Sequence, residues 1–312
     1  MIKLVRVLVM DNKSTFCSKI LLFGEYSVIK NSQALSIPYS LFEGNLAFRR
    51  DNTVAIDPEL KAFSLYLKQL SESSQILFQF DLSSFEFDIS QGLYFDSSIP
   101  QGYGVGSSGA LVAAIFARYH QENSENLDIK KLKSIFSQME SHFHGSSSGV
   151  DPLISFLNSP ILIKNKHELG PVYIPQFKKG KGGIFLINTK RSRKTEPLVN
   201  LFLEKCTNKH FDQLCEQDLS TITNKCIDNF LSADIDQLYT NFKDLSAFQF
   251  EHFTPMIPTL YRKIWNEGLK SNDYFFKLCG AGGGGFLMGI TQDFTKVKQV
   301  MPSQEIRLLM NF

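Results

Sequence analysis

The chain has 312 residues and a formal net charge of +2, from 33 lysines and arginines against 31 aspartates and glutamates. Its length can bury one large or two ordinary cores, and 43% hydrophobic with 21% charged residues is typical of globular proteins. The near balance of charge excludes a broad electrostatic attraction to nucleic acid or membrane, so any basic site must be local.

The first ten residues, MIKLVRVLVM, are apolar with a basic start. They are too short to span a bilayer and lack a small-residue cleavage site. We interpret them as an edge strand or as an upstream extension, with Met10 as an alternative start. Five widely spaced cysteines without a CxxC pair argue against a disulfide framework or a zinc site. Cytoplasmic location is therefore the expectation.

Residues 16–23 (FCSKILLF) form a β-rich run that contains Lys19. A lysine inside an apolar strand is usually exposed at a sheet edge. Further strands of a meander are predicted at 34–39 and 44–49.

Residues 58–79 carry apolar side chains at helical spacing and predict a helix. The alternating segments 85–89 and 93–96 predict two strands that lead into the next motif.

The stretch 100–110, PQGYGVGSSGA, places four glycines around two serines and runs into an apolar helix at 111–119. Glycines let a backbone approach a ligand closely, and the first N–H groups of a helix favour an anion. The pattern is neither a P-loop nor a dinucleotide fingerprint. A phosphate site and a simple tight turn both fit this stretch alone.

Residues 129–143 predict an amphipathic helix that ends in a small, polar segment reaching Asp151. Taken alone, Asp151 before a proline suits a turn or helix cap. The polar stretch 164–183 is a candidate domain boundary.

The second half begins with a predicted strand at 183–188 and a basic turn at 189–195. Helical patterns follow through 196–270. Two strands, 275–279 and 286–290, then flank the glycine run 280–285. A hairpin turn needs only one or two glycines, so this run indicates a close backbone approach.

Three stretches in this order carry a family resemblance: KILLFGEY from Lys19, PQGYGVGSSGA from Pro100, and KLCGAGGGGF from Lys277. They resemble the three motifs of the GHMP kinase superfamily. ESHFHGSSSGVD, from Glu140 to Asp151, and NTKRSRKT, from Asn188 to Thr195, are most similar to segments of the mevalonate kinases.

Two positions depart from that pattern. Tyr26 stands where mevalonate kinases usually carry histidine, and Gly-Glu-Tyr is common in phosphomevalonate kinases. Ser147 replaces the usual proline. Both departures concern the acceptor side, so the acceptor is less well defined than the reaction.

The resemblance implies an α+β, two-domain GHMP kinase fold. Residues 1–165 would form the N-terminal domain, of ribosomal-protein-S5-like type, and residues 166–312 a C-terminal ferredoxin-like α/β sandwich. It implies an enzyme that uses ATP and Mg²⁺ to phosphorylate a small alcohol, with mevalonate as the expected acceptor in isoprenoid precursor synthesis. No nucleic acid or membrane partner is expected, and a homodimer is left open.

The resemblance also assigns roles. Asp151 would accept or orient the acceptor's hydroxyl proton, and Lys19 would sit against Asp151 and the γ-phosphate. Ser108 and Glu140 would hold Mg²⁺ through oxygens that suit a hard cation. His142 and His144 are interpreted as structural. Lys190 and Arg193 would lie on the acceptor side, or would have a fold-stabilising or surface role. The nucleotide would contact Gly102, Gly104, Gly106, Ser107, Ser108, Gly109, Gly282 and Gly283, and the acceptor Glu25, Tyr26 and Thr195.

Two alternatives stay open. Phosphomevalonate kinase would need extra cations, which Lys190, Arg191, Arg193 and Lys194 could supply. A non-catalytic binding protein of the same fold would be expected to lose Lys19, Glu140 or Asp151, and all three are present.

Overall fold

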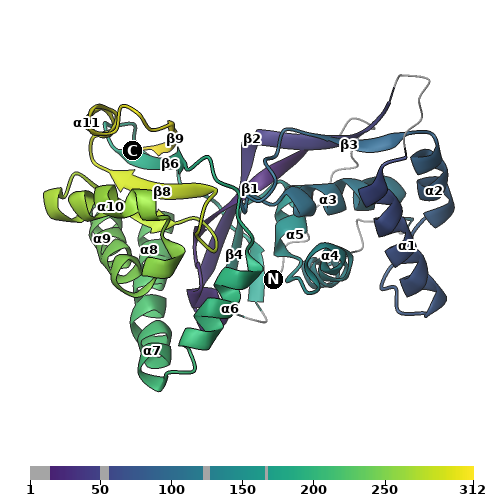
Figure 1. The fold of residues 1–312 in the computed structure, drawn as a ribbon, viewed down its shortest axis with the longest axis horizontal. Helices are drawn as coiled ribbons and strands as arrows, with labels where there is room; N and C mark the ends of the chain where they lie inside the picture. The colour runs from purple at the N-terminus through teal and green to yellow at the C-terminus, as the bar shows by residue number, and fades with distance from the viewer. Residues whose placement is uncertain (1–14, 50–55, 122–126, 166–167) are drawn as a thin grey trace. The chain divides into compact units, whose positions relative to one another are not determined.

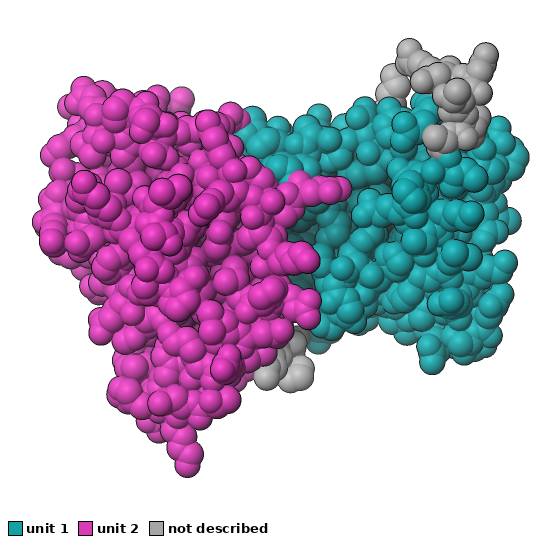
Figure 2. All heavy atoms as spheres, viewed as in Figure 1, with its two compact units in different colours: residues 1–19, 38–100, 106–159 teal, residues 20–37, 101–105, 160–312 magenta. Residues whose placement is uncertain are grey.

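The computed structural model describes residues 15–49, 56–121, 127–165 and 168–312, so the N-terminal segment 1–10 lies outside the described residues. The chain divides into two compact units (Figure 2). Unit 1 comprises residues 1–19, 38–100 and 106–159, and unit 2 comprises 20–37, 101–105 and 160–312. These units are defined by contacts, and the domains 1–165 and 166–312 stay a prediction.

The core of unit 1 is built around α3 (Ser107–Tyr119), whose apolar residues are nearly all buried. It contacts α4 (Ile129–His144) and α5 (Val150–Leu157), which also contact each other (Figure 1). Because α3 is apolar around most of its circumference, neighbouring helices cover it on several sides. Unit 1 also contains α1 (Pro58–Glu72), α2 (Leu82–Ser90) and β3 (Leu93–Ser97).

Strands β1 (Phe16–Phe23) and β2 (Ala34–Phe48) each contribute residues to both units. In unit 1, residues 44–48 of β2 pair antiparallel with β3. In unit 2, residues 34–36 of β2 pair with β4 (Ile161–Asn165), which pairs with β5 (Glu168–Pro171).

Unit 2 contains an antiparallel sheet in the order β7-β8-β6-β9. Strands β7 (Tyr274–Leu278) and β8 (Phe286–Thr291) are buried along their whole length, and β6 (Gly183–Asn188) along all but its last residue. Helices α9 (Ile235–His252) and α10 (Thr259–Ser271) contact β7 (Figure 1). The strands are β6 (Gly183–Asn188), β7 (Tyr274–Leu278), β8 (Phe286–Thr291) and β9 (Ile306–Asn311). The helical elements are η1 (Ser27–Lys30), α6 (Glu196–Lys205), α7 (Lys209–Leu214), the π-helical η3 (Cys215–Leu219), α8 (Ser220–Leu231), α9 (Ile235–His252), η4 (Thr254–Met256), α10 (Thr259–Ser271) and α11 (Phe294–Val300).

Two predictions of local structure are wrong. Residues 85–89 lie in helix α2, because Phe85 and Ile89, four residues apart, are buried on one side and Asp81 caps the helix at Ser84 N, 3.0 Å away. The exposed Phe87 produced the apparent alternation. The strands predicted at 34–39 and 44–49 are one continuous strand, β2.

Most other predicted elements are present, including β1, α4, β6, β7 and β8. The helix predicted at 58–79 ends earlier, at Glu72, and the helix after the glycine-rich stretch begins at Ser107 rather than at 111. Among the described residues, no helix combines the length and apolar character that crossing a bilayer requires.

Candidate functional site

The N-terminus of α3, in unit 1, has the backbone geometry of an anion site. Gly106 is its N-cap in the left-handed conformation, with φ +80°, and none of the described side chains caps the helix. The first intrahelical bond runs from Ala110 N to Gly106 O, 3.0 Å. The N–H groups of Ser107, Ser108 and Gly109 therefore precede the hydrogen-bonded ladder and carry the positive end of the helix dipole. This geometry suits a phosphate.

Lys19 and Asp151 meet beside this helix end. Lys19 Nζ lies 3.0 Å from Asp151 Oδ2. Lys19 is on β1 and only 8% exposed. It is therefore buried, unlike most lysines in apolar strands, which are exposed at a sheet edge. Asp151 is in the first turn of α5. The contact expected from the sequence is present, while the catalytic roles of both residues stay predictions.

Two glycines make this approach of the chain segments possible. A Cβ on Gly106 would lie 2.9 Å from Lys19 Cγ, and one on Gly109 would lie 2.8 Å from the carbonyl carbon of Asp151. Both distances are shorter than side-chain carbons tolerate, so α3 packs against Lys19 and α5 only with glycine at these positions.

Glu140 and Ser108 form the second pair of this cluster. Ser108 Oγ donates to Glu140 Oε1 at 3.2 Å, and Ser147 Oγ donates to Glu140 Oε2. His144 Nε2 also lies 2.9 Å from Ser108 Oγ. Burial, followed by the charge of Asp151, raises the pKa of Glu140 to about 7, although the hydrogen bonds and Lys19 oppose this shift.

The Ser108–Glu140 pair fits Mg²⁺. Octahedral Mg²⁺ with ligands at about 2.0–2.1 Å places neighbouring ligand oxygens about 2.9 Å apart, close to the 3.2 Å between these two oxygens. A hydroxyl and a carboxylate are hard oxygen ligands. Among the described residues, no group of three or more histidine, cysteine, aspartate or glutamate side chains could hold a metal. Mg²⁺ in proteins usually has few protein ligands, and phosphates and water complete its coordination. The Ser108–Glu140 pair agrees with this type of site.

In unit 2 the glycine run 280–285 is held by a buried polar network. Lys277 Nζ lies 2.6 Å from Glu25 Oε1, and both side chains are almost completely buried. Gly280 N donates to the same Glu25 oxygen at 3.4 Å, and Tyr26 OH donates to Ala281 O at 2.6 Å. Glu25 and Tyr26, expected to bind the acceptor, thus make internal contacts to the glycine run, and their acceptor-binding role stays a prediction.

Gly282 and Gly283, expected at the nucleotide, both have φ +76°, a conformation that favours glycine. A Cβ on Gly282 would lie 2.5 Å from Met256 O. Their shape therefore depends on close backbone packing within unit 2, and their contact with a nucleotide stays a prediction.

Arg193 is the main cationic group beside the glycines of unit 2. A Cβ on Gly104 would lie 2.2 Å from its Nη2, and one on Gly280 would lie 2.6 Å away. Arg193 Nη1 donates to Thr195 Oγ1 at 2.7 Å, and its backbone N donates to Gly102 O at 2.9 Å. The side chain thus fills space that the glycines leave open.

The guanidinium of Arg193 also lacks a hydrogen-bond partner at one of its nitrogen atoms. Its Nε has no hydrogen-bond partner, and no acidic side chain among the described residues forms an ion pair with it. Burial lowers its pKa, yet an arginine stays charged at neutral pH. A half-buried guanidinium without a direct ion pair favours an anionic ligand. The sequence alone left this residue open between an acceptor-side role and a fold-stabilising or surface role.

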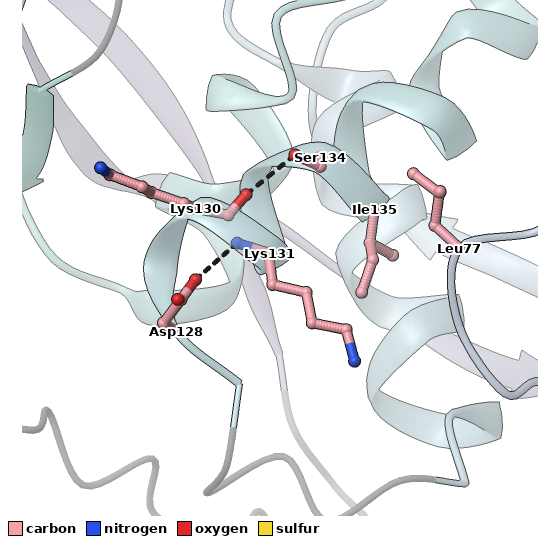
Figure 3. Close-up of a pocket in the computed structure, with 6 residues that line it drawn as sticks. All are labelled: Leu77, Asp128, Lys130, Lys131, Ser134 and Ile135. Carbon is pink, nitrogen blue, oxygen red and sulfur yellow. Dashed lines mark hydrogen bonds between the residues drawn. The ribbon is translucent and has the colours of Figure 1, made fainter.

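A separate surface hollow of about 340 Å³ lies at the other end of α4, near its N-terminus. Figure 3 shows two local hydrogen bonds among its lining residues: Lys131 N donates to Asp128 at 2.7 Å, and Ser134 Oγ donates to Lys130 O at 3.0 Å. Since Glu140 and His144 are on later turns of this helix, the hollow is distinct from the cluster around Ser108.

Comparison with known proteins supports one family. Residues 65–159 match the model of the GHMP kinases N terminal domain. A mevalonate kinase of Dictyostelium discoideum is 23% identical, with 90% of this chain and 88% of that protein covered. A mevalonate kinase of Archaeoglobus fulgidus is 26% identical, with 87% and 89% covered.

Solved structures are similar in fold. L. major mevalonate kinase in complex with R-mevalonate has a TM-score of 0.63 at 17% identity, covering 97% of this chain and 93% of that one. Streptococcus pneumoniae phosphomevalonate kinase in complex with phosphomevalonate and AMPPNP has a TM-score of 0.61 at 14% identity, covering 96% and 98%. The expected two-domain GHMP kinase fold is confirmed.

Proposed function

Because this chain belongs to the GHMP kinases, we propose that it transfers the γ-phosphoryl group of ATP to the hydroxyl of mevalonate, giving 5-phosphomevalonate. The observation that carries the proposal is the Lys19–Asp151 contact of 3.0 Å beside the uncapped N-terminus of α3. A phosphate-binding helix end next to a carboxylate–lysine pair suits phosphoryl transfer to an alcohol.

Different residues of the chain would bind the phosphates, accept the hydroxyl proton and hold the metal. The N–H groups that open α3, from Ser107 to Gly109, bind phosphate oxygens and offset their charge. Asp151 orients the acceptor hydroxyl and takes its proton, and Lys19 holds the Asp151 carboxylate and contacts the transferred group. Ser108 and Glu140 would hold Mg²⁺, which supplies neutralisation of the phosphate charge.

The acceptor's anionic group is assigned to Arg193. Mevalonate carries a carboxylate, and Arg193 is a half-buried cation whose Nε has no hydrogen-bond partner. A guanidinium can bind a carboxylate through two parallel hydrogen bonds. Thr195, whose hydroxyl accepts from Arg193 at 2.7 Å, would fix the orientation of that guanidinium.

Phosphomevalonate is the second candidate acceptor. Lys190, Arg191 and Lys194 are exposed cations in the loop that also carries Arg193, and a second phosphate would require such charges. A phosphomevalonate kinase is among the proteins of similar fold.

Steady-state assays with ATP, Mg²⁺ and either mevalonate or 5-phosphomevalonate test the assignment. The proposal predicts a much higher kcat/KM with mevalonate. A preference for 5-phosphomevalonate would replace it with the second candidate, and absence of turnover with any small alcohol would favour a non-catalytic binding protein. The cytoplasmic location and the homodimer stay predictions.

A further inference from the structure

Ser147 makes three contacts that tie together the segments around the Glu140 carboxylate. Its Oγ donates to Glu140 Oε2 and accepts from Gly149 N at 3.0 Å. Its carbonyl oxygen accepts from Ser137 Oγ at 2.5 Å. The residue is therefore fixed to α4 at two points and to the N-cap of α5 at a third.

The first consequence concerns the orientation of Glu140. Ser108 donates to Oε1 and Ser147 donates to Oε2, so each carboxylate oxygen has its own donor. Two donors on opposite oxygens define the plane of the carboxylate. Glu140 is only 4% exposed, so water cannot readily replace a donor that is lost.

The second consequence concerns α5. Gly149 has φ +72°, and a Cβ there would lie 2.2 Å from Lys133 O, so its backbone is packed directly on α4. Asp151 follows two residues later in the first turn of α5. The Ser147 hydroxyl thus connects the Glu140 carboxylate with the backbone that places Asp151.

We propose that Ser147 is a positioning residue. It orients the Glu140 carboxylate for Mg²⁺ and holds that carboxylate at a fixed position relative to the start of α5. The inference rests on the proposed function, since it takes Glu140 as a metal ligand. The hydrogen bonds of the Ser147 hydroxyl fix the turn between α4 and α5 and also reach the Glu140 carboxylate.

The test measures binding of AMPPNP by calorimetry, with and without Mg²⁺, for the full chain. The ratio of the AMPPNP affinity with Mg²⁺ to the affinity without Mg²⁺ measures how much the metal contributes to binding. Ser147→Ala is expected to leave metal-free binding unchanged and to reduce the ratio about 10- to 100-fold, as for other residues that orient metal ligands. Ser147→Thr, which keeps the hydroxyl, should retain the ratio. Ser146→Ala, at an exposed neighbouring serine, is the matched control.

An unchanged ratio in Ser147→Ala would overturn the inference. If that variant does not fold, Ser147→Thr is compared with Ser147→Val, which has the same shape without a hydroxyl, and equal ratios would overturn it. Failure of the proposed function is distinguishable. Wild-type protein that shows the Mg²⁺ effect but no mevalonate turnover refutes only the acceptor, whereas normal turnover with an unchanged Ser147→Ala ratio refutes only the role of Ser147.

Discussion

Lys19 Nζ and Asp151 Oδ2 lie 3.0 Å apart although 132 positions separate them in the sequence (151 − 19). The lysine side chain is 10% exposed and the aspartate side chain 33% exposed. One partner is thus shielded while the other remains accessible to a ligand. A carboxylate held this way can receive a proton from a bound alcohol while the lysine stabilises its charge.

Asp151→Asn keeps the shape of the side chain but removes the base and the charge. We expect kcat with mevalonate to fall by about 10²- to 10⁴-fold, the usual contribution of a general base, with ATP binding retained. Initial-rate kinetics and nucleotide calorimetry on the same preparation measure both. A variant that turns over at a nearly normal rate would remove Asp151 from its assigned role.

Gly106→Ala tests whether the close packing of Lys19 is needed. The new Cβ would adopt φ +80° and lie 2.9 Å from Lys19 Cγ. Gly145→Ala is a matched control because Gly145 has φ +70° but nothing within 4 Å of its would-be Cβ. Both variants should lose stability from backbone strain, by about 1–2 kcal/mol at Gly106, which is in the left-handed helical conformation. Only Gly106→Ala should also lose kcat, and equal activity in the two folded variants would contradict the account.

The Glu25–Lys277 pair should be essential for stability. Lys277→Met leaves the Glu25 carboxylate buried without its partner, which costs about 3–5 kcal/mol. The exposed pair Lys263–Glu267, at 3.9 Å, provides the comparison, and Lys263→Met should change stability by less than about 1 kcal/mol. Urea unfolding followed by circular dichroism measures both. Similar losses in the two variants would show that burial of the first pair has no special effect.

Arg193→Met should raise KM for mevalonate by at least about tenfold, since it removes a charged hydrogen-bonding group worth about 1.5–3 kcal/mol. KM for ATP should change much less. Arg193→Lys keeps the charge but not the forked geometry, so it should recover only part of the loss. Arg307→Met, at an exposed arginine of β9, serves as control. An unchanged KM for mevalonate in Arg193→Met would exclude the carboxylate assignment.

Residues whose type and local pattern fix their structure were predictable from the sequence. The glycines and serines of 100–110 indicated a helix N-terminus that binds an anion, and α3 begins there, at Ser107. The family resemblance predicted that Lys19 lies next to Asp151 and Ser108 next to Glu140, and both contacts are present. Lys19 shows the limit of the strand pattern alone, because its burial depends on a partner from α5.

Contacts between distant backbones were not predictable. Arg193 looked like one cation in a basic turn, and its partial burial follows from the space left by Gly104 and Gly280. Ser147 was visible only as a departure from the family pattern, since its hydrogen bond to Glu140 depends on how the turn after α4 folds. Residues 85–89 were misassigned to a strand because the exposed Phe87 imitates strand alternation.

The central claim is that this site phosphorylates mevalonate with Asp151 as the base. The most direct test is the rate of ADP formation from ATP and Mg²⁺, with and without mevalonate, for the wild type and Asp151→Asn. The account predicts mevalonate-dependent ADP formation by the wild type and its loss in the variant. A wild-type rate of ADP formation that is the same with and without mevalonate would contradict the account. An equal mevalonate-dependent rate in the wild type and Asp151→Asn would also contradict it.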